Sequence, residues 1–412
     1  MKRNIIIVQF FLLLLTGCYK GDVKYVDFAD LSMAENSTFR VISQKTTNLQ
    51  DLSNNPEWLE LVGIVDTTTT PQANVAGIAP PQRATSTSVA GIMQELLDFS
   101  KTAVAVELSG VYKSVDVNDQ PILLSGKVIL PAKGPIKRYI LVSHYTIASN
   151  REAPSNIFSL EGLLVKLGYA LIIPDYIGYG LTRDRIHPYL HGSLTAHNAV
   201  DMLLYTRALL DSMQVAPYSD GIYIVGYSQG GAVALWTQRL LEEQYAEQIP
   251  IRACFAGSGP YDVATTFDDA VMRNRVGLPL VVPYLVIGTK VAYGLEVDCE
   301  AFFTAAMQKK YTRYIINKEY GIGSLYFRMP QHRLCHWMTK EGMDKTYPAT
   351  KKIYEGLLQS SLVHYAIDDS EVGSDSIVPA WRPHSPTYIF HSKQDEVVTF
   401  YNALHLQRAI GA

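Results

Sequence analysis

The sequence contains no long run of lysine and arginine, and its formal net charge is −3 over 412 residues. Proteins that bind nucleic acid neutralise several phosphates with clustered cations, so we expect no nucleic-acid partner. The sequence also contains no internal repeat, which argues against solenoid and propeller architectures. Hydrophobic residues make up 48% of the chain, enough for a large buried core.

The N-terminal apolar stretch is too short to cross a bilayer comfortably. Lys2 and Arg3 precede this stretch, which runs from Ile5 to Leu15 and ends in Leu-Thr-Gly-Cys. That ending resembles the bacterial lipobox, whose cysteine, here Cys18, is acylated and becomes the mature N-terminus. We therefore interpret residues 1–18 as a lipoprotein signal peptide. This predicts a lipid-anchored protein of the bacterial cell envelope, at the outer membrane or cell surface. The alternative is an ordinary secretory signal that contains a cysteine.

Cysteine is scarce, with 4 residues in the chain. After Cys18 there remain Cys254, Cys299 and Cys335, and an odd number excludes complete internal pairing in an exported protein. Cys254 lies in an apolar run, which indicates an inert core thiol. A Cys299–Cys335 disulfide stays open as one alternative.

Residues 19–88 lack the regular spacing of apolar residues that helices and strands require. They are polar at first and then rich in Thr, Ala, Pro and Ser, which is typical of a tether and linker, with a short helix around Trp58 as an option. The segments after the linker divide into a core of residues 89–262 and 385–412 and an insertion of residues 263–384.

Apolar runs alternate with amphipathic segments in the core. We expect strands over 103–115, 122–130, 139–142, 169–173, 222–225, 251–255 and 386–391. We expect helices over 92–99, 157–167, 194–213 (capped by Ser193), 229–245 and 400–410. An antiparallel hairpin followed by strand–helix alternation predicts an α/β fold, with a mostly parallel sheet buried on both faces by helices.

The strongest motif lies between one predicted strand and the next helix. It reads Gly226-Tyr227-Ser228-Gln229-Gly230 and matches the G-x-S-x-G elbow. A strand that turns straight into a helix strains the backbone at the serine, and bulky residues two positions away on either side would collide there. The turn leaves the Ser228 hydroxyl exposed above the sheet, with the Gln229 N–H free to meet an oxyanion. The alternative is a glycine-rich turn that merely needs small residues.

With this elbow, the chain resembles the α/β-hydrolase superfamily, and more narrowly its secreted lipase and esterase branches. The resemblance covers roughly residues 100–262 and 385–412 and includes the Pro-Asp-Tyr-Ile-Gly-Tyr-Gly segment that begins at Pro174. It implies that Ser228 is a nucleophile that forms an acyl-enzyme. It also implies that Asp175 holds a loop in place.

The segment Val-Ser-His-Tyr-Thr, which begins at Val142, resembles the His-Gly segment of the same family. In that family the backbone after the histidine donates the second oxyanion N–H. Tyr145 stands where glycine is common, so the donor is Tyr145 or, alternatively, Thr146. We expect His144 to organise this loop rather than to act as a base.

A carboxylate follows the last predicted strand. Asp395, followed by Glu396 and two valines, resembles the family's acid loop and would orient a catalytic imidazole. The alternatives are a solvated turn aspartate, or Glu396 as the acid.

The sequence shows no clear candidate for that imidazole. The triad order in this fold is serine, acid, histidine, and His405 is the only histidine after Asp395. His405 falls inside a predicted helix, where we expect it to face solvent or the sheet. We therefore expect that the last strand of the fold is missing and that the chain as written has little activity, unless His405 is the base.

The insertion, residues 263–384, is far longer than an ordinary connection. Predicted helices over 301–314 and 349–358, together with many aromatic residues, indicate a lid. The apolar run 278–287 is too short for a membrane span. His332 and His336 have no evident third ligand, so we expect no metal, and nothing indicates a cofactor.

These features favour a carboxylic-ester hydrolase that acts on lipid or small esters or on acylated glycans. Two alternatives remain: a serine peptidase, and a non-catalytic surface lipoprotein that uses the same fold as a binding module. Substrate identity and oligomeric state stay open.

Overall fold

The computed structural model describes residues 38–52, 104–215, 221–366, 376–379 and 381–411. The predicted signal peptide with Cys18, the helix at 92–99 and the option of a helix around Trp58 lie outside the described residues.

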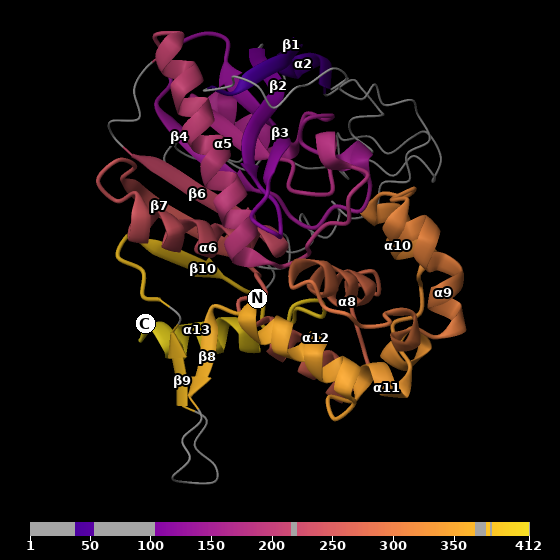
Figure 1. Cartoon of the computed structure of the whole chain (residues 1–412). Helices are drawn as coiled ribbons and strands as arrows, with labels where there is room; N and C mark the ends of the chain where they lie inside the picture. The colour runs from indigo at the N-terminus through magenta and orange to yellow at the C-terminus, as the bar shows by residue number, and fades with distance from the viewer. Residues whose placement is uncertain (1–37, 53–103, 216–220, 367–375, 380, 412) are drawn as a thin grey trace, which may run out of the picture.

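The core is one mixed sheet of order β1-β2-β3-β5-β4-β6-β7-β10 (Figure 1). Its strands are β1 (Arg40–Asn48), β2 (Val104–Val115), β3 (Pro121–Pro131), β4 (Arg138–Ser143), β5 (Tyr169–Pro174), β6 (Ile222–Tyr227), β7 (Ile251–Gly257) and β10 (Thr387–Phe390). The pairs from β1 to β5 are antiparallel, and β5, β4, β6, β7 and β10 run parallel. This architecture confirms the predicted hairpin followed by a parallel sheet.

The predicted linker contains a strand, which corrects its boundary. β1 pairs antiparallel with β2, and the short helix α2 (Leu49–Leu52) follows it directly. Leu49 and Leu52 are buried and pack with the sheet. The sequence of β1 is polar because this strand forms the edge of the sheet and most of its side chains are exposed or half-buried.

Helices α5 (Gly192–Ser212), α6 (Gln229–Gln244) and α13 (Tyr401–Ile410) pack against one face of the sheet. We call it the helix face. The N-cap of α5 is His191, whose side chain accepts the Leu194 N–H, and not Ser193 as predicted. The predicted helix at 157–167 is a 3-10 helix, η3 (Leu160–Leu167), and covers part of the opposite face.

Burial of the opposite face differs along the sheet. Ile140 of β4 and Leu171 of β5 are buried beside η3. On β10, Tyr388 and Phe390 are 49% and 59% exposed. The prediction that both faces are buried is therefore confirmed for β4 and β5 and wrong for β10.

The insertion adds helices and a hairpin beside the core (Figure 1). Its elements are α7 (Val263–Arg273), α8 (Val281–Ala292), η5 (Glu300–Phe302), α9 (Ala305–Tyr311), η6 (Thr312–Ile316), α10 (Ile322–Arg328), η7 (Leu334–His336), α11 (Lys340–Met343), α12 (Pro348–Gln359), β8 (Val363–Ala366) and β9 (Ser376–Pro379). The predicted helix at 301–314 is thus divided among η5, α9 and η6.

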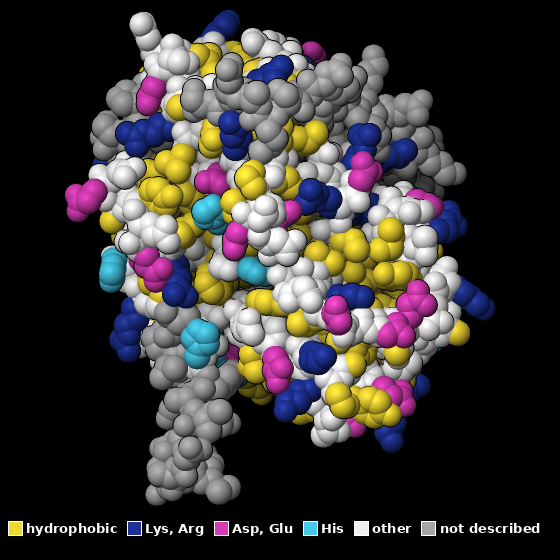
Figure 2. All heavy atoms as spheres, in the orientation of Figure 1, with side chains coloured by type: hydrophobic (Ala, Val, Ile, Leu, Met, Phe, Trp, Pro, Cys, Tyr) yellow, Lys and Arg dark blue, Asp and Glu magenta, His cyan; other side chains and the backbone are white. Residues whose placement is uncertain are grey.

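The insertion has an apolar core of its own, which includes most of the apolar run 278–287 within and before α8. Figure 2 shows apolar side chains interspersed with charged ones over its outer surface. Among the described residues, no helix is both long enough and apolar enough to span a membrane.

The described cysteines form no disulfide. Cys299 is buried and Cys335 is exposed, and the two thiols are not bonded to each other. Cys254 is fully buried, and burial raises the pKa of its thiol well above the ordinary value.

Candidate functional site

Ser228 occupies the turn between β6 and α6. Its φ of 55° and ψ of −123° lie in a region that non-glycine residues rarely adopt. Its N–H donates to the Gly257 carbonyl at 2.8 Å, which fixes the turn to the neighbouring strand β7. The predicted strained strand–helix turn is therefore present, and the Ser228 side chain is only half-buried.

Two glycines make this turn sterically possible. A Cβ on Gly226 would lie 2.0 Å from the Gly230 carbonyl oxygen, and a Cβ on Gly230 would lie 1.9 Å from the Ser143 oxygen. Contacts this short cannot be accommodated by rotation because the opposing atoms belong to the backbone. The second contact also shows that α6 begins directly against the end of β4, where the predicted oxyanion segment starts.

The backbone N–H of Gln229 lies in the first turn of α6, where amides have no partner within the helix. The Gln229 side chain is buried, and its amide group donates to His187 Nε2 at 2.6 Å. His187 in turn donates from Nδ1 to the Ile177 carbonyl at 2.8 Å. Burial lowers the pKa of His187 to about 3, so it is a neutral acceptor that holds Gln229. No local pattern in the sequence indicates His187, which lies 42 residues before Gln229.

The loop after β4 is held by side chains on several elements. His144 bonds the Tyr145 carbonyl through Nδ1 at 2.6 Å and stacks on Tyr176. Burial lowers the pKa of His144 to about 4, so it organises the loop as an uncharged ring. The Thr146 hydroxyl bonds the Tyr189 hydroxyl at 2.8 Å. The two candidate oxyanion donors, Tyr145 and Thr146, therefore lie on a fixed segment.

Asp395 follows β10 in a tight turn. Its Oδ1 accepts the N–H groups of Val397 and Val398, both at 2.9 Å. Its Oδ2 lies 3.8 Å from Nε2 of the buried His391. Glu396, the alternative acid, is largely exposed and pairs with Arg275 at 2.9 Å. The turn thus directs the two carboxylates to different surroundings.

Ser228 and Asp395 lie at the same edge of the sheet. The Ser228 N–H bonds Gly257 at the end of β7, and the Ser258 N–H bonds Phe390 at the end of β10. The ends of β6, β7 and β10 are therefore adjacent, with β7 between the serine turn and the acid turn. In parallel sheets this carboxyl edge is where ligands usually bind.

No protein-family model and no curated protein matches this chain. Solved structures do resemble it. The rice cell wall degrading esterase LipA from Xanthomonas oryzae aligns over 78% of this chain and 84% of its own, at 20% identity and a TM-score of 0.65. A protein from Legionella pneumophila described as a hydrolase aligns over 79% of this chain and 85% of its own, at 18% identity and a TM-score of 0.62.

Lipase A from Candida antarctica, in its closed state, covers 74% of this chain and 68% of its own, at 18% identity and a TM-score of 0.53. These proteins share one architecture. The chain has the α/β-hydrolase fold.

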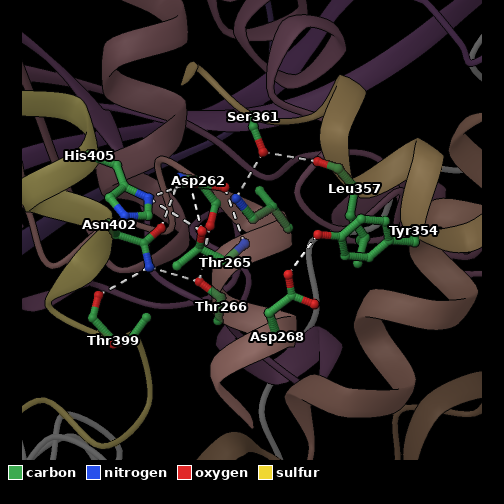
Figure 3. A network of polar contacts seen from close by, with 11 residues as sticks. Asp262, Thr265, Thr266, Asp268, Tyr354, Leu357, Ser361, Thr399, Asn402 and His405 are labelled. Atoms are coloured by element: carbon green, nitrogen blue, oxygen red, sulfur yellow. Dashed lines mark hydrogen bonds and ion pairs between the residues drawn. The ribbon is translucent and has the colours of Figure 1, made fainter. Parts of the chain in front are cut away.

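His405 lies on α13 of this α/β-hydrolase fold, and its partner is not Asp395. Its Nδ1 bonds Oδ2 of the fully buried Asp262 at 2.7 Å and lies 3.3 Å from the Thr265 hydroxyl. Figure 3 shows the ring directed at Asp262, within a polar network that joins α13 to the start of α7. Asn402 belongs to the same network and accepts the Asp262 N–H at 2.8 Å.

No hydrogen bond joins an imidazole to the Ser228 hydroxyl within the part of the chain that the structure describes. His144 and His187 are buried and engaged with backbone or Gln229, and His405 is engaged with Asp262. The described residues therefore contain the serine turn, the predicted oxyanion segment and the predicted acid turn, and among them no imidazole is hydrogen-bonded to the serine.

Asp175 is fully buried, as expected of a structural residue. It accepts the Ser125 hydroxyl at 2.6 Å and the Ser155 N–H at 2.8 Å, and so ties the loop after β5 to β3.

No group of three potential metal-binding side chains occurs among the described residues. His332 bonds the Val276 carbonyl, and His336 packs edge-on against Trp337.

Proposed function

We propose that this protein is a serine-dependent carboxylic-ester hydrolase that forms an acyl-enzyme on Ser228. The observation that carries the proposal is the strained backbone of Ser228 at the junction of β6 and α6. Strain of this kind persists where the surrounding structure imposes it, and it is concentrated at functional sites. The esterase and lipase neighbours support ester hydrolysis as the reaction class.

In the proposed reaction, Ser228 Oγ attacks the ester carbonyl carbon and its proton passes to a base. The backbone N–H groups of Gln229 and Tyr145 stabilise the oxyanion, and Thr146 remains the alternative donor. The tetrahedral intermediate collapses, the C–O bond to the alcohol breaks, and the alcohol leaves with a proton. Water then releases the acid by the same steps. Asp395 is proposed to orient the imidazole that serves as the base.

A fluorophosphonate probe tests the nucleophile directly. Phosphonylation of Ser228, located by mass spectrometry and lost in Ser228→Ala, is the expected result. Ser193→Ala serves as a matched control, because Ser193 lies in the first turn of α5 with an exposed side chain and should not affect labelling. Absence of labelling in the wild-type chain under conditions that label a known esterase would contradict the proposal.

The role of His405 needs a separate test. Because its imidazole is bound by Asp262, we expect His405→Ala to change p-nitrophenyl acetate turnover by less than about tenfold, whereas loss of a triad histidine costs about a million-fold. Asp262→Asn is the companion variant, since it removes the negative charge that faces the His405 imidazole. A loss of turnover by several orders of magnitude in His405→Ala, with the fold intact by circular dichroism, would assign the base to His405.

A non-catalytic binding module is the second candidate. It is favoured by one observation: no imidazole contacts Ser228 within the described residues. A binder predicts no phosphonate labelling but saturable retention of ester-bearing ligands, so the labelling experiment separates the two candidates.

We propose that residues 263–384 form a lid over the site and that the substrate is a lipid ester, a small ester or an acylated glycan. One neighbour is described as degrading the rice cell wall, and another is a lipase crystallised in a closed state. Comparing p-nitrophenyl esters of two and twelve carbons with an acetylated xylan tests this choice. Deletion of the proposed lid, residues 263–384, should change the preference between the two-carbon and twelve-carbon esters more than it changes turnover of the two-carbon ester.

We also propose that Cys18 is acylated and anchors the protein in the bacterial cell envelope. Metabolic labelling with an alkyne fatty acid should mark the wild-type protein and not Cys18→Ser. The exposed Cys335 provides the control, since Cys335→Ser should label normally. Labelling that persists in Cys18→Ser would contradict the lipobox interpretation.

A further inference from the structure

Glu152 connects the insertion to the oxyanion segment, by which we mean residues 142–149: the Val-Ser-His-Tyr-Thr stretch and the three residues that follow it. Its Oε2 accepts the N–H groups of Ala148 and Ser149 at 2.9 and 3.0 Å. Its Oε1 accepts the N–H of Ile322, the first residue of α10, at 2.9 Å. One carboxylate therefore holds two regions that are 170 residues apart in the sequence.

No lysine, arginine or histidine of the described part of the chain pairs with the Glu152 carboxylate. Among the described residues, all its hydrogen-bond donors are backbone amides and the Ser149 hydroxyl. Burial raises the pKa of Glu152 above its ordinary value, although these hydrogen bonds oppose the rise. Partial burial of a charge without a counter-ion costs free energy, and the hydrogen bonds to this half-buried carboxylate offset that cost.

Gly321 permits the close approach on the insertion side. A Cβ at this position would lie 2.7 Å from Glu152 Oε1. Any larger residue at position 321 would therefore displace either the carboxylate or the start of α10.

Tyrosine hydroxyls bond two further carbonyls of the oxyanion segment. The Ile147 carbonyl accepts the Tyr179 hydroxyl at 2.6 Å, and the Ala148 carbonyl lies 3.4 Å from the Tyr284 hydroxyl of α8. Ala148 is fully buried within the apolar cluster of the insertion. The end of the oxyanion segment thus packs within the apolar core of the insertion. Glu152 adds hydrogen bonds to the segment, at Ala148 and Ser149, and to the insertion, at Ile322.

We propose that Glu152 is a positioning residue that couples the insertion to the oxyanion segment, so that the donor at Tyr145 or Thr146 is correctly placed only while α10 is seated. The inference rests on the proposed function of Ser228 and the oxyanion segment. Seating of α10 by a bound substrate would then also set the oxyanion site.

Glu152→Gln tests this coupling with little change in shape. A glutamine has one acceptor oxygen, so it keeps either the Ile322 bond or the bonds to Ala148 and Ser149, whichever way the amide is turned. Gly321→Ala disturbs the contact from the opposite side. Asp344→Asn is the matched control, because Asp344 is a carboxylate of the insertion that accepts the Thr346 N–H at 2.9 Å in an exposed position.

Three measurements are made on each full-length variant: amide hydrogen exchange, the rate of phosphonate labelling at Ser228, and the melting temperature. We expect Glu152→Gln and Gly321→Ala to raise exchange in both 144–150 and 319–328 and to slow labelling about tenfold. This is less than the roughly 100- to 1,000-fold cost of removing an oxyanion donor, because the donor is displaced and not lost. The melting temperature of Glu152→Gln should not fall, because the substitution also removes a desolvated charge. Asp344→Asn should match the wild type in all three readouts.

The proposal is overturned if exchange rises in 319–328 alone, or if labelling slows only in proportion to a lower melting temperature. Exchange does not depend on catalysis, so it separates this proposal from the proposed function. If the wild-type chain is not labelled, the proposed function fails. The coupling is then still tested by hydrogen exchange in the Glu152→Gln and Gly321→Ala variants. Exchange that rises in both 144–150 and 319–328 supports it, and exchange that rises in 319–328 alone overturns it.

Discussion

The two faces of the sheet at β6, β7 and β10 are built from alternate residues of the same strands and differ sharply in burial. On the helix face, Ile224 and Cys254 are fully buried under the helices. On the opposite face, Phe255 is half-buried and Phe390 is 59% exposed. Apolar composition is thus similar on both faces, and the covering elements account for the difference.

The opposite face is itself divided. Its aromatic part runs from Tyr223 through Phe255 to Tyr388, with the last two rings stacked at 5.1 Å. Its other end, near β2 and β3, is so well covered that it contains an ion pair between Glu107 and Lys127, both nearly inaccessible to solvent. Coverage by α2 and η3 therefore separates the two parts.

The largest expected effect is at the covered end. Glu107→Gln leaves Lys127 buried without its counter-charge, and we expect a loss of about 4 kcal/mol in the free energy of unfolding, measured in urea. Glu319→Gln is the matched control, since its partner Arg313 lies on the surface and the change should have little effect. A small loss for Glu107→Gln would mean that water reaches this end of the face.

The same pair predicts a pH dependence. Burial raises the pKa of Glu107, but Lys127 and Thr47 more than offset this and hold the pKa below its ordinary value of 4.5. A depressed folded-state pKa contributes stability above pH 4.5 that is lost as the pH falls through the folded-state value. The free energy of unfolding, measured in urea at pH 7, 4.5 and 3, should fall as the pH is lowered. It should fall less steeply with pH in Glu107→Gln than in the wild type.

The next effect concerns the helix face. Ile224→Ala should cost about 3 kcal/mol, because it removes a fully buried side chain from a packed interface. The residue before it, Tyr223, is half-buried on the opposite face, and Tyr223→Ala should cost clearly less. Equal losses at these neighbouring positions would contradict the difference between the faces.

A smaller effect is expected in the middle of the aromatic part. Phe255→Ala should lower the free energy of unfolding by about 1.5 kcal/mol, roughly half the cost of a fully buried phenylalanine. Phe255→Leu, which keeps most of the apolar volume, should recover part of the loss. A cost above about 3 kcal/mol would show that Phe255 is covered in solution.

The smallest effect is expected at β10. Phe390→Ser should change stability by no more than about 0.5 kcal/mol, since this ring is mostly exposed. Light scattering should show less self-association in the variant, because an exposed aromatic residue has been removed. A large destabilisation would place Phe390 in a buried contact.

Local patterns predicted most of the core. Apolar runs that alternate with amphipathic segments predicted every strand from β2 to β7. The spacing of the glycines predicted the turn at Ser228. β1 was missed because its polar sequence is that of an edge strand, which is stabilised by pairing and not by burial. The exposure of Phe390 was missed because periodicity shows which residues share a face and not whether anything covers that face.

The supporting residues of the candidate site could not be predicted in this way. His187 holds Gln229 across 42 residues, and Glu152 holds Ile322 across 170. Such contacts exist only once the chain is folded, and a single sequence gives no signal for them. His405 was expected to face solvent or the sheet, and its pairing with the buried Asp262 corrects this, because that contact depends on the packing of α13 against α7.

The backbone conformation at Ser228 would favour a different residue if stability alone were selected. Glycine adopts a φ of 55° without steric cost, whereas serine there carries a penalty of about 1–3 kcal/mol. Selection for a robust fold alone would favour glycine at this position. The hydroxyl group at this position therefore lowers the stability of the fold, and the proposed function gives a reason for the serine: its oxygen would be the nucleophile.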